Sequence, residues 1–259
     1  MQDREKDLGI ISDPRLRSEI ARFLVERFYG DIGLDEPENI ANFGLLNEHL
    51  KIGSALVIFN QISNDNAPIV IASTIAKCSQ SIRVVSGVAS YKDLDFRRYP
   101  YQATLITVLS SLSGFKPFPV VQDYDQVSYS LEKKKDLLRE LRERGKEILG
   151  QPGGVLFISP EGTRSLDGTL QRAKGGIRRL STYGDVHILP VAFIPQGEYS
   201  RDLNVFSQGR FVMKTGELFT IEEVVEEGIP KGLNSADGAM LKLGELLPSR
   251  MRGFYAPYY

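Results

Sequence analysis

Apolar residues recur at helical spacing near the beginning of the chain. In residues 14–28 they lie mostly three or four positions apart, at Leu16, Ile20, Phe23, Leu24 and Phe28. A shorter apolar pattern follows in residues 45–50. Because residues at this spacing share one face of an α-helix, both stretches are predicted to be helical. We therefore expect an N-terminal helical segment over residues 1–45 and a larger domain over residues 46–259.

Beyond these helices, short apolar runs alternate with helical patterns. The runs are residues 55–59, 82–89, 118–121, 154–159 and 186–194. Short apolar runs are typical of buried strands, and strands that alternate with helices form a parallel sheet with helices on its faces. The sequence therefore predicts an α/β fold with a mixed, mostly parallel sheet flanked by helices. A short strand at residues 210–214 and a helix at residues 235–247 are expected before an aromatic tail.

A long helix is predicted between the third and fourth apolar runs. Its apolar face carries Val127, Leu131, Leu138, Leu141 and Ile148, and the glycines and proline of residues 150–154 end it. The opposite face is basic, with Lys133, Lys134, Lys135, Arg139, Arg142 and Arg144. The simplest interpretation is a face exposed to solvent, and the alternative is docking to a membrane.

The charge of the chain is nearly balanced. Its 259 residues include 32 Lys and Arg and 33 Asp and Glu. Binding of nucleic acid through a basic surface depends on an excess of cations, so nucleic acid is not an expected partner. Cys78 is the only cysteine, which excludes an intramolecular disulfide and favours a small buried hydrophobic residue. No cluster of Cys and His along the sequence offers metal ligands, and neither a metal nor a cofactor is predicted.

Two stretches bear on localisation. The first six residues are mostly polar or charged and lack the apolar core of a secretion signal, so the expected compartment is the cytoplasm. Residues 99–115 carry no formal charge, but they are shorter than the ~20 apolar residues that span a bilayer. Burial in the core explains this stretch about as well as peripheral contact with the inner face of the membrane.

Residues 160–165 carry the most informative chemistry of the chain. They read Pro-Glu-Gly-Thr-Arg-Ser after a predicted strand, and Lys174-Gly175-Gly176 follows at the opening of a helix. Arg164 offers a planar fork of donors to a phosphate, and Lys174 adds a second positive charge. The stretch therefore suits a phosphomonoester ligand. From composition alone, an ion pair between Glu161 and Arg164 is an equal alternative.

These residues resemble the third conserved block of the glycerol-3-phosphate and lysophosphatidate acyltransferase superfamily, Phe-Pro-Glu-Gly-Thr-Arg-Ser with a later Lys-Gly pair. Residues 188–193, with Pro190-Val191, are similar to the fourth block, and residues 247–248 and 252–255 resemble the C-terminal pattern. The resemblance covers about residues 45–255. It implies a glycerolipid acyltransferase-like fold and substrate-binding roles for Glu161, Gly162, Thr163, Arg164 and Lys174.

The first conserved block departs from the family pattern. Family members carry Asn-His, four residues and then Asp, where this chain has Asn60-Gln61 and Asn66. The resemblance implies that the His takes the proton of the acceptor hydroxyl and that the Asp orients the imidazole. Gln61 and Asn66 therefore stand at the catalytic positions but cannot act as base and orienting carboxylate. Asp65 lies one residue short of the required spacing and is expected to cap the helix that Pro68 helps to open.

Other polar elements of the family site also differ. The second block often ends in an Arg that holds the phosphate, and residues 118–123 contain none. A family Lys that assists the acyl oxyanion would fall near Ser90, with Lys92 as the nearest substitute. The chain has two histidines, His49 and His187, both expected to be structural or at the surface. His187 could serve as a base only if the fold brought it beside Gln61.

Two functions follow from the resemblance. The first is transfer of an acyl group from acyl-CoA or acyl carrier protein to a glycerol-phosphate or lysophospholipid hydroxyl. The second is a catalytically silent relative, a pseudoenzyme that binds a lipid, a glycerol phosphate or an acyl carrier protein without turnover. The replacement of His and Asp by Gln61 and Asn66 favours the second. A third interpretation is an active enzyme altered deliberately at both positions, since both changes keep polarity and approximate size.

Overall fold

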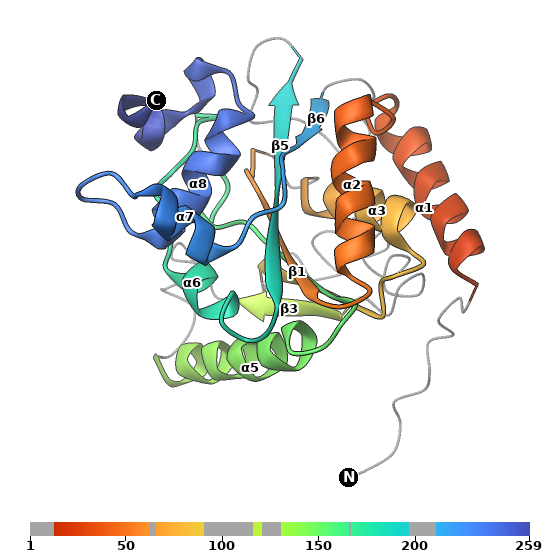
Figure 1. The fold of residues 1–259 in the computed structure, drawn as a ribbon, viewed down its shortest axis with the longest axis horizontal. Coiled ribbons are helices and arrows are strands. Elements are labelled where there is room, and N and C mark those ends of the chain that lie inside the picture. Colours follow the sequence, from red (N-terminus) through yellow and green to blue (C-terminus); the bar gives the residue numbers. More distant parts are fainter. Residues whose placement is uncertain (1–12, 63–65, 91–115, 121–130, 166, 197–210) are drawn as a thin grey trace.

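The sheet is the centre of the protein. The computed structural model describes residues 13–62, 66–90, 116–120, 131–165, 167–196 and 211–259. Within them, six strands form one sheet in the order β3-β2-β4-β1-β5-β6 (Figure 1). All neighbours in the sheet are parallel except β5 and β6. The strands are β1 (Ser54–Phe59), β2 (Val84–Ser90), β3 (Lys116–Val120), β4 (Gly154–Ile158), β5 (Val186–Pro195) and β6 (Phe211–Thr215).

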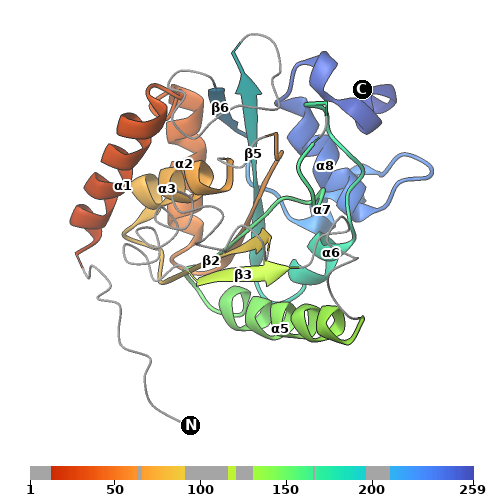
Figure 2. The same ribbon diagram turned by 180° about the vertical axis from the view of Figure 1, so that it is seen from behind.

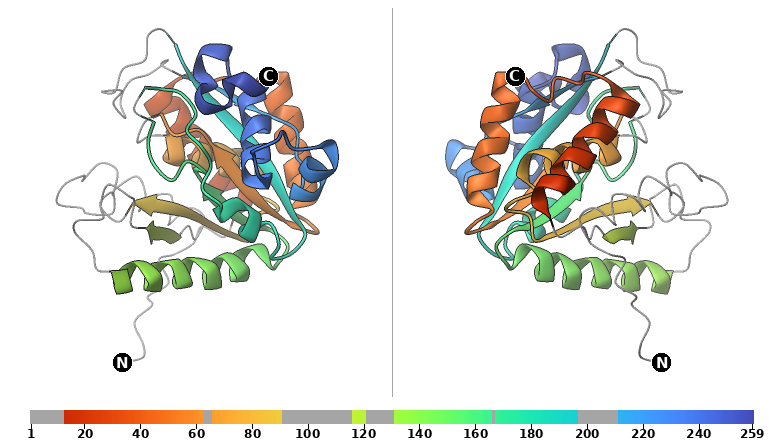
Figure 3. Two further views of the ribbon diagram at one scale, coloured as in Figure 1. Left: turned by 90° about the vertical axis from the view of Figure 1, so that its left-hand side faces the viewer. Right: turned by 90° about the vertical axis from the view of Figure 1, so that its right-hand side faces the viewer.

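Helices cover the two faces of the sheet. On one face lie α1 (Pro14–Tyr29), α2 (Pro37–His49) and α3 (Asn66–Cys78), which pack against one another. On the other lie α5 (Leu131–Leu149), α6 (Gly176–Leu180), α7 (Ile221–Glu227) and α8 (Ser235–Glu245), as Figures 1 and 2 show from front and back. Two short 3-10 helices, Ser249–Met251 and Gly253–Tyr258, follow α8. Figure 3 shows α5 alongside β2 and β3.

The connections explain this layering. From β1 the chain passes through α3 to β2, and from β3 it passes through α5 to β4 in the opposite direction across the sheet. Because crossovers between parallel strands are right-handed, helices that connect in opposite directions fall on opposite faces. Strand β1 is therefore covered on both sides, and all six of its residues are buried. This burial explains why β1 is a continuous apolar run instead of an alternating one.

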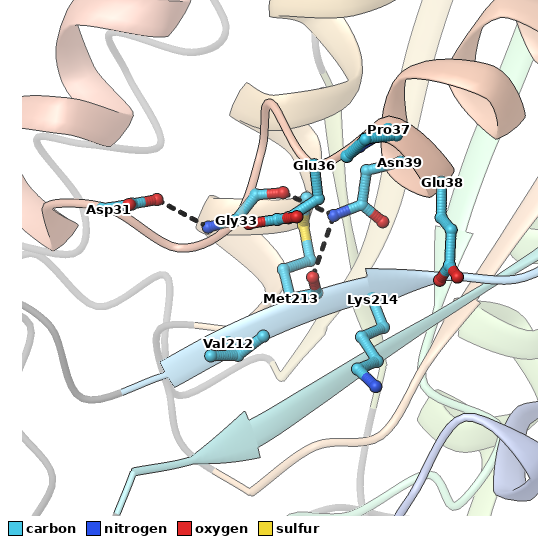
Figure 4. A pocket seen from close by; sticks show the side chains of 9 residues that line it. All are labelled: Asp31, Gly33, Glu36, Pro37, Glu38, Asn39, Val212, Met213 and Lys214. Atoms are coloured by element: carbon cyan, nitrogen blue, oxygen red, sulfur yellow. Dashed lines mark hydrogen bonds between the residues drawn. The ribbon is translucent and has the colours of Figure 1, made fainter.

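Strand β6 is an edge of the sheet, and the segment before and within α2 covers it. The Met213 N–H donates to the Ile32 carbonyl at 2.8 Å. The buried Asn39 amide donates to the Met213 carbonyl at 2.9 Å and accepts the Thr215 N–H at 2.7 Å. Asn42 donates to the Thr215 carbonyl at 2.9 Å. Figure 4 shows Asn39 between the Gly33 turn and Met213, where these residues line a pocket.

Most predicted elements are present with shifted ends. The predicted α/β class, with its mostly parallel sheet and N-terminal helices, is confirmed. Helix α2 begins at Pro37, well before the predicted start at residue 45. The early start was missed because the first two turns bury only Asn39 and Phe43 and so lack an apolar pattern. Helix α7 was not predicted, although Thr220 and Glu223 form the capping box that marks its start. The division of the chain at residue 45 stays a prediction.

One prediction about α5 is wrong. Leu138 was assigned to the apolar face, but its side chain is 50% exposed, whereas Leu137 is 6% exposed. Leu137, Leu141 and Ile148 share the inward face, and neighbouring positions on a helix point about 100° apart. Arg139 and Arg142 are exposed, as expected for a solvated face. The predicted contributions of Val127, Leu131, Lys133 and Lys134 lie outside the described side chains.

The apolar stretch at residues 99–115 also lies outside the described residues. Among the helices that the structure does describe, none is both long enough and apolar enough to cross a bilayer.

Candidate functional site

Gln61 and the motif of residues 160–165 lie at the carboxyl ends of β1 and β4. These strands are neighbours, with Ile58 opposite Ile158. After β1 the chain turns to α3 on one face, and after β4 it turns toward α6 on the other. Such a divergence of neighbouring parallel strands is the position at which open α/β sheets place ligands. Gln61 follows β1, and residues 159–165 follow β4.

Asn60 fixes the beginning of the segment that follows β1. Its buried side chain donates to the Phe193 carbonyl at 2.9 Å and accepts the Phe193 N–H at 2.7 Å. The amide thus continues the pairing of β1 with β5 by one residue after the strand ends. Gln61 is half-buried directly after this anchor. This role of Asn60 was not predicted, because its only signal in the sequence is an amide side chain at the end of an apolar run.

Glu161 connects the three segments of the site. One carboxylate oxygen accepts the Gln61 N–H at 3.2 Å, and the other accepts the Gln171 N–H at 2.8 Å. In addition, the Ser165 N–H donates to the Gln61 carbonyl at 2.8 Å. The segment after β1, the turn after β4 and the segment before Lys174 are therefore held together. This gives Glu161 a positioning role that does not depend on Arg164.

The burial of Glu161 changes its acidity. The side chain is 1% exposed, and desolvation raises the pKa of the carboxyl to about 7. The N–H groups of Gln171 and Gln61 pull the pKa down, and the charge of Asp167 pushes it up. A group with this pKa has the acidity of a general base, but both oxygens already accept backbone donors and the side chain has almost no contact with solvent. Glu161 therefore serves to hold the Gln61 and Gln171 segments together inside the protein.

Lys174 brings a positive charge close to Gly162. Gly162 has a φ of 65°, and its N–H donates to the Ser159 carbonyl at 3.1 Å. A Cβ at this position would lie 2.9 Å from Cδ and 3.5 Å from Nζ of Lys174, so the lysine side chain runs across the glycine. The Lys174 N–H donates to the Pro160 carbonyl at 2.9 Å. Thr163 and Arg164 are half-buried in the same turn.

The C-terminal segment anchors the segment before Lys174 from outside the site. The Tyr255 hydroxyl accepts the Ala173 N–H at 2.8 Å and donates to the fully buried Asp237 carboxylate at 2.8 Å. The Leu170 N–H donates to the Met251 carbonyl at 2.9 Å, and the Leu170 carbonyl accepts from Phe254 at 3.0 Å. The sequence marked residues 252–255 only as a resemblance, so this anchoring role was missed.

Comparison with models of protein families and with curated proteins found no match. Among solved structures, the chain is similar to the 1-acyl-sn-glycerophosphate (LPA) acyltransferase PlsC from Thermotoga maritima. The alignment covers 90% of this chain and 93% of that chain, with 14% sequence identity and a TM-score of 0.42. This similarity by itself assigns the chain to no family.

Several predicted residues lie partly or wholly outside the description. Asn66 is the first residue of α3, but its side chain and the predicted cap Asp65 lie outside the described residues. The same holds for Lys92, for residues 121–123 and for the side chain of Ser90. The roles predicted for Gln61, Asn66, Glu161, Gly162, Thr163, Arg164 and Lys174 stay predictions.

Both histidines lie at the other end of the sheet. His187 is near the start of β5, opposite Ala55 of β1, and its ring centroid is 3.8 Å from that of His49. With a strand rise of about 3.3 Å per residue, Gln61 lies roughly 20 Å from the level of Ala55. His187 is therefore not beside Gln61. Its burial, and then the neighbouring His49, lower the pKa of His187, while the charges of Asp185 and Glu223 raise it.

Proposed function

We propose that this chain is a phospholipid/glycerol acyltransferase-like protein that binds a phosphorylated glycerol or a lysophospholipid and transfers acyl groups poorly or not at all. The support comes from the turn after β4. Gly162 and the Lys174 side chain lie against each other there, with Arg164 in the same turn. A guanidinium and an ammonium at the carboxyl edge of a parallel sheet suit a phosphomonoester.

The proposal that acyl transfer is weak or absent rests on the location of the two histidines. The chain has no other imidazole, and both lie at the amino end of the sheet, about 20 Å from Gln61. A general base must reach the proton that it removes to within hydrogen-bond distance, about 3 Å. Gln61 itself has no titration near neutral pH. The acceptor hydroxyl of a bound ligand would therefore lack an imidazole base.

The alternative is an active enzyme that uses acyl-CoA or acyl carrier protein as donor. Glu161 is the observation in its favour, because its pKa of about 7 suits a base. Its two oxygens, however, accept the N–H groups of Gln61 and Gln171, and the side chain is buried. Proton transfer from a ligand to Glu161 would require these hydrogen bonds to break. We therefore place the silent binder first.

Two assays on purified protein test the proposal. Calorimetric titration with glycerol 3-phosphate and with lysophosphatidate measures binding, and unphosphorylated glycerol measures the contribution of the phosphate. We expect Arg164→Ala to weaken binding of both phosphorylated ligands by about tenfold or more, since charge-assisted contacts contribute roughly 1.5–3 kcal/mol. Arg142→Ala is the matched control, because Arg142 is exposed on α5 and its loss removes the same charge. This variant should bind both ligands with unchanged affinity.

The second assay follows consumption of an acyl thioester with the same acceptors. We expect no turnover above the uncatalysed rate. Robust acyl transfer by the unaltered protein would refute the silent-binder proposal, and equal affinity of the protein and Arg164→Ala would refute the phosphate role of this residue. Cytoplasmic location with peripheral contact to the inner face of the membrane remains a proposal, which flotation with anionic liposomes tests directly.

A further inference from the structure

A second group of chemically active side chains lies at the amino end of the sheet. His49 ends α2, Asp185 immediately precedes β5, and His187 is the second residue of β5. The end of α2 and the beginning of β5 lie at the same end of the sheet, where β1 and β5 begin (Figure 1). One ring nitrogen of each histidine and one carboxylate oxygen of Asp185 all lie within 4.8 Å of one another.

The backbone around this group holds the three side chains in place. The Ser54 N–H donates to the Asp185 carbonyl at 2.9 Å, and Ser54 pairs with Val186 in the sheet. His49 Nε2 lies 3.0 Å from the Ser54 carbonyl. A Cβ at Gly53 would lie 2.5 Å from His49 Nε2, so the imidazole packs directly on the glycine backbone. Only glycine leaves room for the ring in this position.

The hydrogen bonding of the two imidazoles leaves ligand capacity. A neutral imidazole that donates Nε2–H to the Ser54 carbonyl has its lone pair on Nδ1. Metal-bound histidines usually donate their other nitrogen to a carbonyl or a carboxylate in this way. Within the described part of the chain, the buried Nδ1 atom of His187 has no hydrogen bond, and it lies 3.5 Å from an Asp185 oxygen. An ion between the three groups would satisfy this nitrogen.

We propose that His49, Asp185 and His187 bind one divalent transition-metal ion of the zinc class. Two imidazoles and one carboxylate match the donors that Zn²⁺ accepts, whereas Mg²⁺ and Ca²⁺ prefer oxygen ligands throughout. The side chain of Asp185 is 57% exposed, so solvent reaches the group and water can complete the tetrahedron. The bound ion links the end of α2 to the start of β5, at the amino end of the central strands and away from Gln61.

The composition of the chain makes this site easy to test. Its only histidines are His49 and His187, and its only cysteine, Cys78, is buried. Binding through imidazole therefore reports on this site alone when the protein is prepared without a polyhistidine tag. The titration uses Zn²⁺ against a chromophoric chelator after treatment with EDTA. We expect one equivalent of Zn²⁺ per chain, with no competition from millimolar Mg²⁺ or Ca²⁺.

Three single changes remove one ligand each: His49→Gln, His187→Gln and Asp185→Asn. Residues that only hydrogen-bond to a metal's ligands already contribute about 10- to 100-fold to affinity, so loss of a direct ligand should weaken Zn²⁺ binding at least tenfold. Asp136→Asn is the matched control, because Asp136 is an exposed carboxylate on α5 that pairs with Arg139. It should bind Zn²⁺ as the unaltered protein does.

A second measurement guards against variants that fold poorly. Zn²⁺ should raise the melting temperature of the unaltered protein in a concentration-dependent way, since a ligand specific to the folded state stabilises it by mass action. The Asp185→Asn protein should melt normally without metal and show a much smaller shift with it, because its exposed carboxylate contributes little packing. Absence of saturable Zn²⁺ binding, or an unchanged affinity and melting shift in Asp185→Asn and His187→Gln, would overturn the proposal.

Discussion

The two ends of strand β1 carry different chemistry. At its carboxyl end lie Gln61, Glu161 and Lys174, with backbone donors and cations but no imidazole. At its amino end lie His49 and His187 beside an aspartate. The six residue steps from Ala55 to Gln61 separate the two groups by about 20 Å. The comparison teaches that the presence of a catalytic residue type in a sequence means little until the strand end on which it lies is known.

The strongest way to break this contrast is to place an imidazole at the carboxyl end. We expect Gln61→His combined with Asn66→Asp to raise acyl transfer roughly 10³-fold or more, because members of a catalytic triad contribute factors of about 10⁴ and act as a unit. Thioester consumption with glycerol 3-phosphate and lysophosphatidate measures the gain. Adding His187→Gln should leave the gain intact, and a folded double variant without activity would contradict a competent scaffold.

The second test uses the acidity of Glu161. Its pKa is raised from 4.5 to about 7, so the folded state holds this proton more tightly than the unfolded state. The free energy of unfolding should therefore fall as pH rises through this window, by roughly 3 kcal/mol at most. Urea denaturation of the protein and of Glu161→Gln between these pH values should show the slope only in the former. Glu143→Gln, at an exposed position on α5, should retain the slope of the unaltered protein.

A smaller effect is expected at the anchor outside the site. Tyr255→Phe leaves the Ala173 N–H without its acceptor and removes a donor from the buried Asp237. Leaving buried polar groups unpaired costs about 1–3 kcal/mol, so we expect the free energy of unfolding to fall by about 2 kcal/mol. Tyr258→Phe, at an exposed ring of the same segment, should change it by less than about 0.5 kcal/mol. Similar losses for both variants would show that the Tyr255 hydroxyl has no special role.

The smallest effect is expected at Ser159. Ser159 directly follows β4, and its buried hydroxyl has no hydrogen-bond partner among the residues that the structure describes. Ser159→Ala should therefore leave the free energy of unfolding within about 0.5 kcal/mol or raise it slightly, because no hydrogen bond is lost. The same variant titrated with glycerol 3-phosphate shows whether the hydroxyl serves the ligand. A large loss of stability would mean that this oxygen is paired in solution.

The sequence predicted the α/β class because buried parallel strands leave long apolar runs that periodicity detects. It also pointed to the residues that meet at the carboxyl edge, since a six-residue motif is local information. It could not show that Glu161 clasps Gln61 and Gln171, or that Tyr255 supports Ala173, because these contacts join segments far apart in the chain. The contact between the His49 and His187 rings could not be predicted for the same reason.

The cover over β6 has a consequence for association. Met213 and Thr215 have both their outward N–H and carbonyl groups bonded to Ile32, Asn39 and Asn42. An open β-edge normally offers such groups to any extended peptide that approaches it. A strand of another chain would first have to displace the Asn39 and Asn42 side chains of α2. We therefore expect β6 not to pair readily with another copy of the protein. Crowded solutions of the folded chain should accordingly show little fibre growth seeded from this side.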